Sequence, residues 1–324
     1  MDEFSIIEKY FAPLTMGQAG SAGLQDDGAV LSVPDGHELV VTSDTLNEGV
    51  HFMIGESPDV IARKALRVNL SDLASMGARP LCYQLNIAFP QSPKETWLKE
   101  FSDALLDENS RYDIFCSGGD TTSIKSDYLS ISITAMGCVQ RGKAVRRSGA
   151  KDGDLIVITG CVGDAALGLK SLLAGGQDVD SAYKKAITRS RLPEPRVGIE
   201  KIMHEYVNAA ADVSDGLIAD SMHIAHASGL GIEIDLCAMS FSKTVQTAIN
   251  KGDITVGEAV SGGDDYELVM AVSAENAKKL LSELEKSNLK PQVIGRFIDN
   301  GLKTKVISND EYRINASSKG WKHF

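Results

Sequence analysis

The sequence predicts a mixed α/β (α+β) protein of two domains, and three observations support this fold class. Segments with strand and helix patterns alternate along the chain, which is typical of α/β and α+β folds. A cluster of small, basic and turn-forming residues interrupts the alternation at residues 147–153. The length of 324 residues suits two domains of ordinary size. We therefore expect one domain at residues 1–149 and a second at residues 150–324.

The first half shows strand, helix and strand patterns in turn. Residues 38–43 (ELVVTS) have the β-branched composition of a strand. Residues 59–76 carry apolar side chains at helical spacing, and Gly77 followed by Pro80 is a normal helix end. The other elements expected here are a strand at 81–89, a helix at 94–109 and a long strand at 128–139.

The second half begins with a buried strand. Residues 154–159 (DLIVIT) form the continuous apolar run typical of such a strand, and a Gly-rich turn then leads into a helix over 160–169. Residues 182–196 hold two prolines and several basic residues, which predicts a connector. Beyond it we expect helices at 198–211, 215–228 and 274–287, and strands at 231–236, 268–272 and 293–297.

Composition excludes several classes of protein. Hydrophobic residues make up 43% of the chain and charged residues 24%, which argues against a disordered or fibrous protein. A net charge of −11 is the wrong sign for non-specific nucleic-acid binding. No apolar run reaches the roughly 18 residues that a membrane span needs, and the acidic first ten residues do not resemble a signal peptide. Five widely spaced cysteines without a C-x-x-C pair favour buried thiols in a reducing cytoplasm over a zinc site.

The standard nucleotide-binding and metalloprotease motifs are absent from the sequence. Residues 163–171 nearly reproduce a P-loop, but Leu169 stands where a lysine must follow the glycine to reach the phosphates. We reject a P-loop and favour a structural turn over an anion contact by backbone N–H groups at the helix start. His223 and His226 share a helix face, where polar surface is the favoured interpretation.

A recurring pattern places an acid beside glycine or hydroxyl residues. One such segment is a helix-start or turn signal by itself, because Ser and Asp cap helices and Asp-Gly marks turns. Six segments of the same chemistry favour a shared site, since α/β folds bind ligands at strand ends. The segments are Asp26-Asp27-Gly28, Thr42-Ser43-Asp44-Thr45 at a strand end, Asn69-Leu-Ser-Asp72 in a helix, Ser117-Gly-Gly-Asp120-Thr-Thr122 in a turn, Asp212-Val-Ser214-Asp215-Gly216 before a helix, and Ser261-Gly-Gly-Asp264-Asp265.

Clustered carboxylates of this kind point to Mg²⁺ chemistry. Mg²⁺ prefers hard oxygen ligands in octahedral geometry. Two ionised carboxylates 4 Å apart repel by about 4 kcal/mol at an effective dielectric constant of about 20. Several bound Mg²⁺ ions would remove this repulsion and turn an acidic region into a receptor for polyphosphate. Arg146 and Arg147 are candidate phosphate partners, with a solvated basic turn as the equal alternative.

At this point the sequence resembles the thiamine-monophosphate kinase family, within the superfamily of aminoimidazole ribonucleotide synthetase. The resemblance runs from Phe4 to Phe324 and rests on motifs that occur in order. They are the acidic segments above, His51-Phe52, Met76-Gly-Ala78, Arg147-Ser-Gly-Ala150, Asp212-Val-Ser-Asp-Gly-Leu217, Gly262-Gly-Asp-Asp-Tyr-Glu-Leu268 and the ending Lys319-Gly-Trp-Lys-His-Phe324.

The resemblance implies a fold, a reaction and a homodimer. The N-terminal domain, which binds ATP and Mg²⁺, would pair with a second copy into a barrel. The C-terminal domain would be an α/β sandwich, and the active site would lie in the cleft between the domains. The implied reaction is Mg²⁺-dependent transfer of the γ-phosphoryl group of ATP directly to thiamine monophosphate, giving thiamine diphosphate and ADP.

The resemblance also implies roles for matching residues. Asp44 and Asp120 would support a metal-assisted transfer without a certain catalytic base. The implied ATP contacts are Gly119, Asp120, Arg147 and Ser214, and the implied substrate contact is His51. The implied metal ligands are Asp27, Thr42, Ser43, Asp44, Asp72, Asp120, Asp212 and Asp215.

Two positions depart from the family pattern. The family commonly has a substrate-contacting Glu where this chain has Asp264, so Asp264 would reach through water or leave the role to Asp265. Some members carry an aromatic residue that packs on the substrate at the position where this chain has Ser318. Trp321 would supply that aromatic ring here or would anchor the C-terminal core.

Two other functions compete with the kinase. One is an ATP-dependent synthetase of the same superfamily, although its selenide branch wants a reactive cysteine near the N-terminus, and the first here is Cys82. The other is a protein that binds divalent cations or nucleotides without turnover. A protein that binds without turnover would produce no ADP. The kinase and the synthetase would differ in the molecule that accepts the phosphoryl group.

Overall fold

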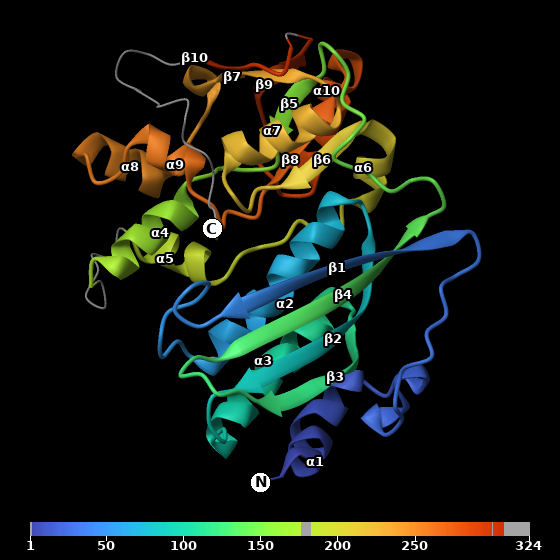
Figure 1. Cartoon of the computed structure of the whole chain (residues 1–324). Coiled ribbons are helices and arrows are strands. Elements are labelled where there is room, and N and C mark those ends of the chain that lie inside the picture. Colours follow the sequence, from blue (N-terminus) through green and yellow to red (C-terminus); the bar gives the residue numbers. More distant parts are fainter. Residues whose placement is uncertain (1, 176–182, 300, 308–324) are drawn as a thin grey trace. The chain divides into compact units, whose positions relative to one another are not determined.

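The structure is a computed structural model that describes residues 2–175, 183–299 and 301–307 (Figure 1). Contacts divide the chain into two compact units, each with its own sheet. The first unit comprises Met1–Leu73 and Ala78–Ala144, and the second comprises Ala74–Gly77 and Val145–Phe324. Within the described residues, no helix is both long and apolar enough to cross a membrane.

The sheet of the first unit has four strands in the order β1-β4-β2-β3. β4 (Ser130–Gln140) pairs antiparallel with β1 (His37–Asn47) and with β2 (Arg79–Phe89). β3 (Phe115–Ser123) lies parallel to β2 at the sheet edge. A parallel pair needs a crossover connection, and α3 (Glu95–Tyr112) provides it.

Two helices cover one face of this sheet. Figure 1 shows α2 (Pro58–Ser75) and α3 together behind the four strands. A buried Glu108 carboxylate on α3 accepts hydrogen bonds from Arg67 Nε at 2.7 Å and Arg63 Nη1 at 2.6 Å on α2, which joins the helices. The N-terminal turns are α1 (Glu3–Ile6), η1 (Ile7–Phe11), η2 (Ala12–Thr15) and η3 (Ala19–Leu24).

The sheet of the second unit has six strands in the order β10-β7-β9-β5-β8-β6. All its pairings are antiparallel except β10 with β7. The strands are β5 (Leu155–Ile158), β6 (Ala209–Asp212), β7 (Gly231–Asp235), β8 (Leu268–Val272), β9 (Gln292–Ile298) and β10 (Thr304–Ile307).

Helices pack on both faces of this second sheet. One core cluster joins Leu217 of α7 and Val260 of α9 to the strands, and another joins Met203 of α6 and Leu280 of α10. A third cluster joins α4, α5 and α8. The helices are α4 (Asp164–Leu173), α5 (Lys184–Arg191), α6 (Glu200–Tyr206), α7 (Leu217–Ala227), α8 (Lys243–Lys251), α9 (Val256–Ser261) and α10 (Ala274–Lys286), with the short turn η5 (Leu236–Ala238).

The mixed α/β fold class is confirmed, but four local predictions are wrong. Residues 117–122 are not a turn, because they form most of β3. A Gly-Gly pair is typical of a turn, but here Gly119 allows β3 to approach β2 closely. A Cβ at this position would lie 1.8 Å from the carbonyl oxygen of Leu85 on β2. Residues 42–45 do not end their strand, since β1 continues to Asn47 and is stabilised by pairing along its full length with β4.

The other two errors lie in the second unit. The predicted helix at 198–211 does not include residues 209–211, which belong to β6. Alanine favours helices locally, yet all four residues of β6 are buried and pair with β8, so tertiary packing overrides the propensity. The connector at 182–196 contains α5, whose Ala186 is fully buried against α4 and α8, and residue 182 lies outside the described residues.

Candidate active site

A carboxylate pair lies between β1 and α2 in the first unit. Thr42 and Asp44 lie two residues apart on one face of β1, the face that carries the buried Val40 and Leu46. Thr42 Oγ1 donates a hydrogen bond to Asp72 Oδ2 of α2 at 2.5 Å. Asn69 lies one helical turn before Asp72, and its side-chain oxygen accepts from the Asp44 backbone N–H at 3.1 Å.

This environment shifts the protonation of Asp44. Burial, and secondarily the charge of Asp72, raise the pKa of Asp44 to about 6. Both causes disfavour the ionised carboxylate, so a divalent cation bound between Asp44 and Asp72 would remove a repulsion that the fold imposes. The donor set of two carboxylates and a hydroxyl consists of the hard oxygens that Mg²⁺ prefers.

Ser43 and Asp120 belong to the other face of the same sheet. Ser43 Oγ lies 3.0 Å from Thr134 Oγ1 on β4, away from α2. Asp120 pairs with Asn86 of β2, in the same cross-strand row as Thr45. β1 and β3 are the two sheet edges, about 14 Å apart at three strand spacings. The first unit therefore brings Asp44 and Asp72 together but does not bring Asp120 to them.

Two other predicted residues of the first unit lie outside regular elements. Asp27 is exposed in the segment between η3 and β1. His51 follows β1, and its Nδ1 accepts from the Asn47 backbone N–H at 3.0 Å, while Lys64 Nζ donates to the His51 carbonyl at 2.9 Å. Because Nδ1 is an acceptor, a neutral His51 carries its proton on Nε2, which suits it to donate to a phosphate oxygen.

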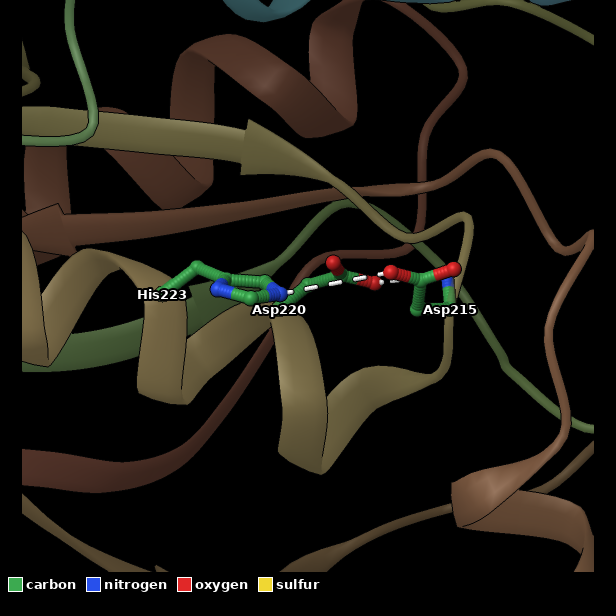
Figure 2. A group of neighbouring side chains, drawn as sticks. All are labelled: Asp215, Asp220 and His223. Atoms are coloured by element: carbon green, nitrogen blue, oxygen red, sulfur yellow. Dashed lines mark hydrogen bonds and ion pairs between the residues drawn. The ribbon is translucent and has the colours of Figure 1, made fainter. Parts of the chain in front are cut away.

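In the second unit, the loop between β6 and α7 carries a second acidic group (Figure 2). Asp212 ends β6 and is buried, and Ser214 and Asp215 follow it. Asp220 lies in the first turn of α7 and is 1% exposed. His223 Nε2 lies 3.9 Å from Asp215 Oδ2.

Asp215, Asp220 and His223 could together hold a metal ion. Their ligand atoms lie within 4.8 Å of one another. Burial, and then the charge of Asp215, raise the pKa of Asp220 to about 7. Burial, and then the positive charge of Arg147, lower the pKa of His223, which favours the neutral imidazole that metals bind.

The backbone that carries Arg147 is held against the end of α7. Ser228, which follows α7, holds the segment: its hydroxyl accepts from the Gly149 and Ala150 backbone N–H groups at 3.2 and 3.1 Å. The same hydroxyl donates to the Arg147 carbonyl at 3.4 Å. The positive charge of Arg147 lowers the pKa of both Asp220 and His223, so it partly offsets the negative charge of the acidic group.

The Gly-Gly-Asp-Asp-Tyr segment lies against the same acidic loop. The Asp264 backbone N–H donates to the Ser214 carbonyl at 3.0 Å, and the Tyr266 N–H donates to the Val213 carbonyl at 2.9 Å. Asp264 and Tyr266 have φ values of +67° and +50°, which non-glycine residues rarely adopt. Backbone strain of this kind clusters at binding sites.

The two neighbouring acids of this segment have different surroundings. The Asp265 carboxylate is fully buried and accepts from the Gly163 and Ala165 backbone N–H groups at 2.7 and 3.1 Å. The acceptor at the start of α4 is therefore the chain's own Asp265 carboxyl group. Asp264 is partly exposed, and its Oδ1 accepts from the Tyr266 hydroxyl at 3.2 Å.

Two buried acidic residues of the second unit were not indicated as site residues by the sequence patterns. Asp220 is the first, and its signal was an acid within an otherwise apolar first turn of a helix. The second is the buried Glu267, which accepts hydrogen bonds from Thr159, Arg189 and Arg196 and fixes the end of the Gly-Gly-Asp-Asp-Tyr segment. Ser318 and Trp321, and with them the Lys-Gly-Trp-Lys-His-Phe ending, lie outside the described residues.

Comparisons with known proteins cover nearly the whole chain. Residues 25–139 match the family model described as AIR synthase related protein, N-terminal domain, and residues 151–307 match the corresponding C-terminal domain. The thiamine-monophosphate kinase of Caulobacter vibrioides is 38% identical over 99% of this chain and 90% of its own length.

Solved structures are also similar to this chain over nearly its whole length. The crystal structure of thiamine-monophosphate kinase from Stenotrophomonas maltophilia is 36% identical, with a TM-score of 0.85, over 94% of this chain and 96% of that chain. A further solved protein, complexed with AMPPCP and TMP, is 29% identical with a TM-score of 0.78, over 92% of this chain and 91% of that chain.

Proposed function

This chain belongs to the thiamine-monophosphate kinase family and is an ATP-dependent phosphotransferase acting on thiamine monophosphate, and we propose that the transfer is direct and requires Mg²⁺. The products would be thiamine diphosphate and ADP. The observation that supports the Mg²⁺ requirement best is the Asp44–Asp72 pair, whose environment disfavours two ionised carboxylates without a cation.

Each unit offers its own metal-binding residues. In the first, Asp44 and Asp72 would hold a Mg²⁺ ion with the Thr42 oxygen, while Asp27, Ser43 and Asp120 would bind further ions. In the second, the ligands would be Asp212 and Asp215. When bound, Mg²⁺ neutralises the charge on the transferring phosphoryl group.

The ATP contacts would be Gly119, Asp120, Arg147 and Ser214. A guanidinium binds phosphate oxygens through paired N–H groups, and the Ser228 hydroxyl holds the backbone that carries Arg147 by donating to the Arg147 carbonyl. Ser214 lies beside Asp215 in the same loop, so a phosphate held by Ser214 would be next to a metal bound by Asp215.

The acceptor would be bound by His51 and Asp264, with Ser318 and Trp321 as further contacts. His51 would donate its Nε2 proton to the thiamine monophosphate, since its Nδ1 is engaged with the Asn47 N–H. The attacking atom is a phosphate oxygen that is already anionic near neutral pH, so no residue needs to remove a proton.

We further propose a cytoplasmic homodimer. On the sheet face opposite α2, Leu39 and Val41 of β1 are 43% and 55% exposed. A second copy placed on this face would bury them. The expectation of buried thiols holds for Cys82, Cys116 and Cys138 but is wrong for Cys237, which is exposed, and for Cys161, which is partly exposed.

A coupled assay tests the proposed reaction. The purified protein is mixed with ATP and thiamine monophosphate, with and without Mg²⁺, and thiamine diphosphate is followed by fluorescence after oxidation to the thiochrome form. We expect product only when ATP and Mg²⁺ are both present. Product formed equally well in EDTA would contradict the Mg²⁺ requirement. ATP binding without any product would instead favour the synthetase or the non-catalytic alternative.

A further inference from the structure

We propose that Asp220 is a positioning residue that fixes the loop carrying Ser214 and Asp215 in its ligand-binding conformation. This inference rests on the proposed roles of Ser214 in ATP binding and Asp215 in metal binding. Asp220 itself would contact neither ligand. It would act through the backbone of the loop.

The contacts of Asp220 are concentrated on a single oxygen. Its Oδ2 accepts hydrogen bonds from three consecutive backbone N–H groups, those of Ser214 at 3.0 Å, Asp215 at 3.0 Å and Gly216 at 3.2 Å. Three N–H groups can point at one atom only if the loop curves around it, so the carboxylate specifies the conformation of all three residues. Figure 2 shows Asp220 projecting from α7 toward Asp215.

The position of Asp220 on its helix makes this contact precise. Its own N–H donates to the Gly216 carbonyl at 3.0 Å, so the first turn of α7 and the loop are joined in both directions. Gly216 has a φ of +120°, and a Cβ there would lie 2.6 Å from the Ser261 carbonyl oxygen. The loop is therefore packed against the end of α9 on one side and held by Asp220 on the other.

A ligand role for Asp220 fits less well than a positioning role. Asp220 is 1% exposed as a residue, and its Oδ2 already has three donors. Asp215 is partly exposed, which leaves it accessible to an ion. His223 does not replace Asp220 as the holder of the loop, because its 3.9 Å separation from Asp215 is longer than a hydrogen bond.

The same loop also supports the acceptor-binding segment. The Ser214 and Val213 carbonyls accept from the Asp264 and Tyr266 N–H groups, so a displaced loop would carry Asp264 with it. We therefore expect loss of Asp220 to weaken Mg²⁺-ATP binding most and thiamine monophosphate binding less.

The test compares Asp220→Asn with Asp154→Asn as a matched control. Asp154 is also buried in the second unit, and its Oδ2 likewise accepts from a backbone N–H, that of Lys151 at 2.9 Å, and from Asn208 Nδ2 at 2.9 Å. It lies outside the candidate site. For each variant we would measure the Mg²⁺ concentration giving half-maximal turnover, KM for ATP, and kcat at saturating Mg²⁺.

The neutral amide oxygen of Asp220→Asn accepts the three N–H groups more weakly than a carboxylate does. We therefore expect the half-saturating Mg²⁺ concentration to rise roughly 10–100-fold, the usual effect of disturbing a residue that orients a metal ligand. Excess Mg²⁺ should restore most of kcat, because Asp215 is still present. Asp154→Asn should lower the melting temperature and leave the Mg²⁺ dependence unchanged. Equal Mg²⁺ dependence in Asp220→Asn and the wild type would overturn the proposal.

Two further measurements keep the outcomes distinct. Amide hydrogen exchange without ATP or Mg²⁺ should accelerate at residues 214–216 in Asp220→Asn, and unchanged protection there would also overturn the proposal. Asp215→Asn reports on the proposed function: if its Mg²⁺ dependence matches the wild type, the assigned metal role of Asp215 fails. If Asp220→Asn does not fold, Asp220→Ser takes its place in both measurements, because Ser keeps an oxygen acceptor on a shorter side chain.

Discussion

At the scale of single residues, Asp44 combines a proposed role in metal binding with a cost in stability. Its pKa in the folded protein is about 6, above the value of 3.8 for a free carboxyl, so the ionised form is destabilising at pH 8. Asp44→Asn removes this penalty, which is about 3 kcal/mol. We expect the variant to melt a few degrees above the wild type in EDTA and to lose turnover.

Calorimetry in EDTA and the thiamine diphosphate assay together check this prediction. A variant that melts lower than the wild type would show that Asp44 stabilises the metal-free fold. Turnover near the wild-type rate would remove Asp44 from the metal ligands.

Asp265 gives a second prediction, in the pH dependence of stability. Burial raises its pKa to about 7 despite the Gly163 and Ala165 hydrogen bonds and the charge of Arg189, which lower it. Between about pH 4 and 7, the folded state therefore keeps a proton on Asp265 that the unfolded state has already released. On account of this group, the free energy of unfolding should fall as pH rises, by up to about 1.4 kcal/mol per pH unit.

Asp265→Asn has no such proton, so its stability should improve relative to the wild type as pH increases. Urea unfolding at pH 5 and pH 7 measures the difference between the two proteins at each pH. A difference that is the same at both pH values would mean that Asp265 titrates alike in the folded and unfolded chain.

At the scale of elements, the β2–β3 ladder depends on one glycine. A Cβ at Gly119 would lie 1.8 Å from the Leu85 carbonyl oxygen, whereas a Cβ at Gly118 meets nothing closer than 3.7 Å, the flexible Gln84 side chain. Gly119→Ala should therefore destabilise the protein by about 3 kcal/mol or more. Gly118→Ala, the adjacent control, should change stability by less than about 1 kcal/mol. Urea denaturation of both variants tests this, and similar losses would contradict the special role of Gly119.

The same strand shows why part of the fold could not be predicted from the sequence. The helix at 59–76 and the strand at 268–272 were predicted correctly because their apolar patterns are local. β3 and β6 were missed because their Gly-Gly and Ala-rich sequences take strand form only when a neighbouring strand pairs with them. Local propensity carries no information about such pairing.

Part of the candidate site could likewise be predicted from the sequence, and part could not. Candidate ligands within one motif, such as Ser214 and Asp215, could be predicted from adjacent sequence. The meeting of Thr42 with Asp72 depends on a strand facing a helix, and the sequence pattern indicated only that both carry oxygen ligands. Asp220 was missed because a buried acid in the first turn of a helix looks like an ordinary charged residue until its three N–H donors are visible.

At the scale of the whole molecule, the open face of the first sheet predicts self-association. A dimer of standard size buries about 800 Å² per partner around an apolar centre. Val41 is 55% exposed near the middle of β1, and Val41→Glu would place a charge at that centre. Burying an unpaired charge is costly, so we expect Val41→Glu to sediment as a monomer while the wild type sediments as a dimer.

Leu173→Glu is the matched control for this prediction. Leu173 is 69% exposed on α4 of the second unit, so the same apolar-to-acidic change occurs away from the sheet face. Analytical ultracentrifugation over a concentration series should show this variant dimerising like the wild type. Dimers of unchanged affinity in Val41→Glu would exclude this sheet face as the interface. Loss of the dimer in both variants would instead indicate that added negative charge alone drives the copies apart, because the chain already carries a net charge of −11.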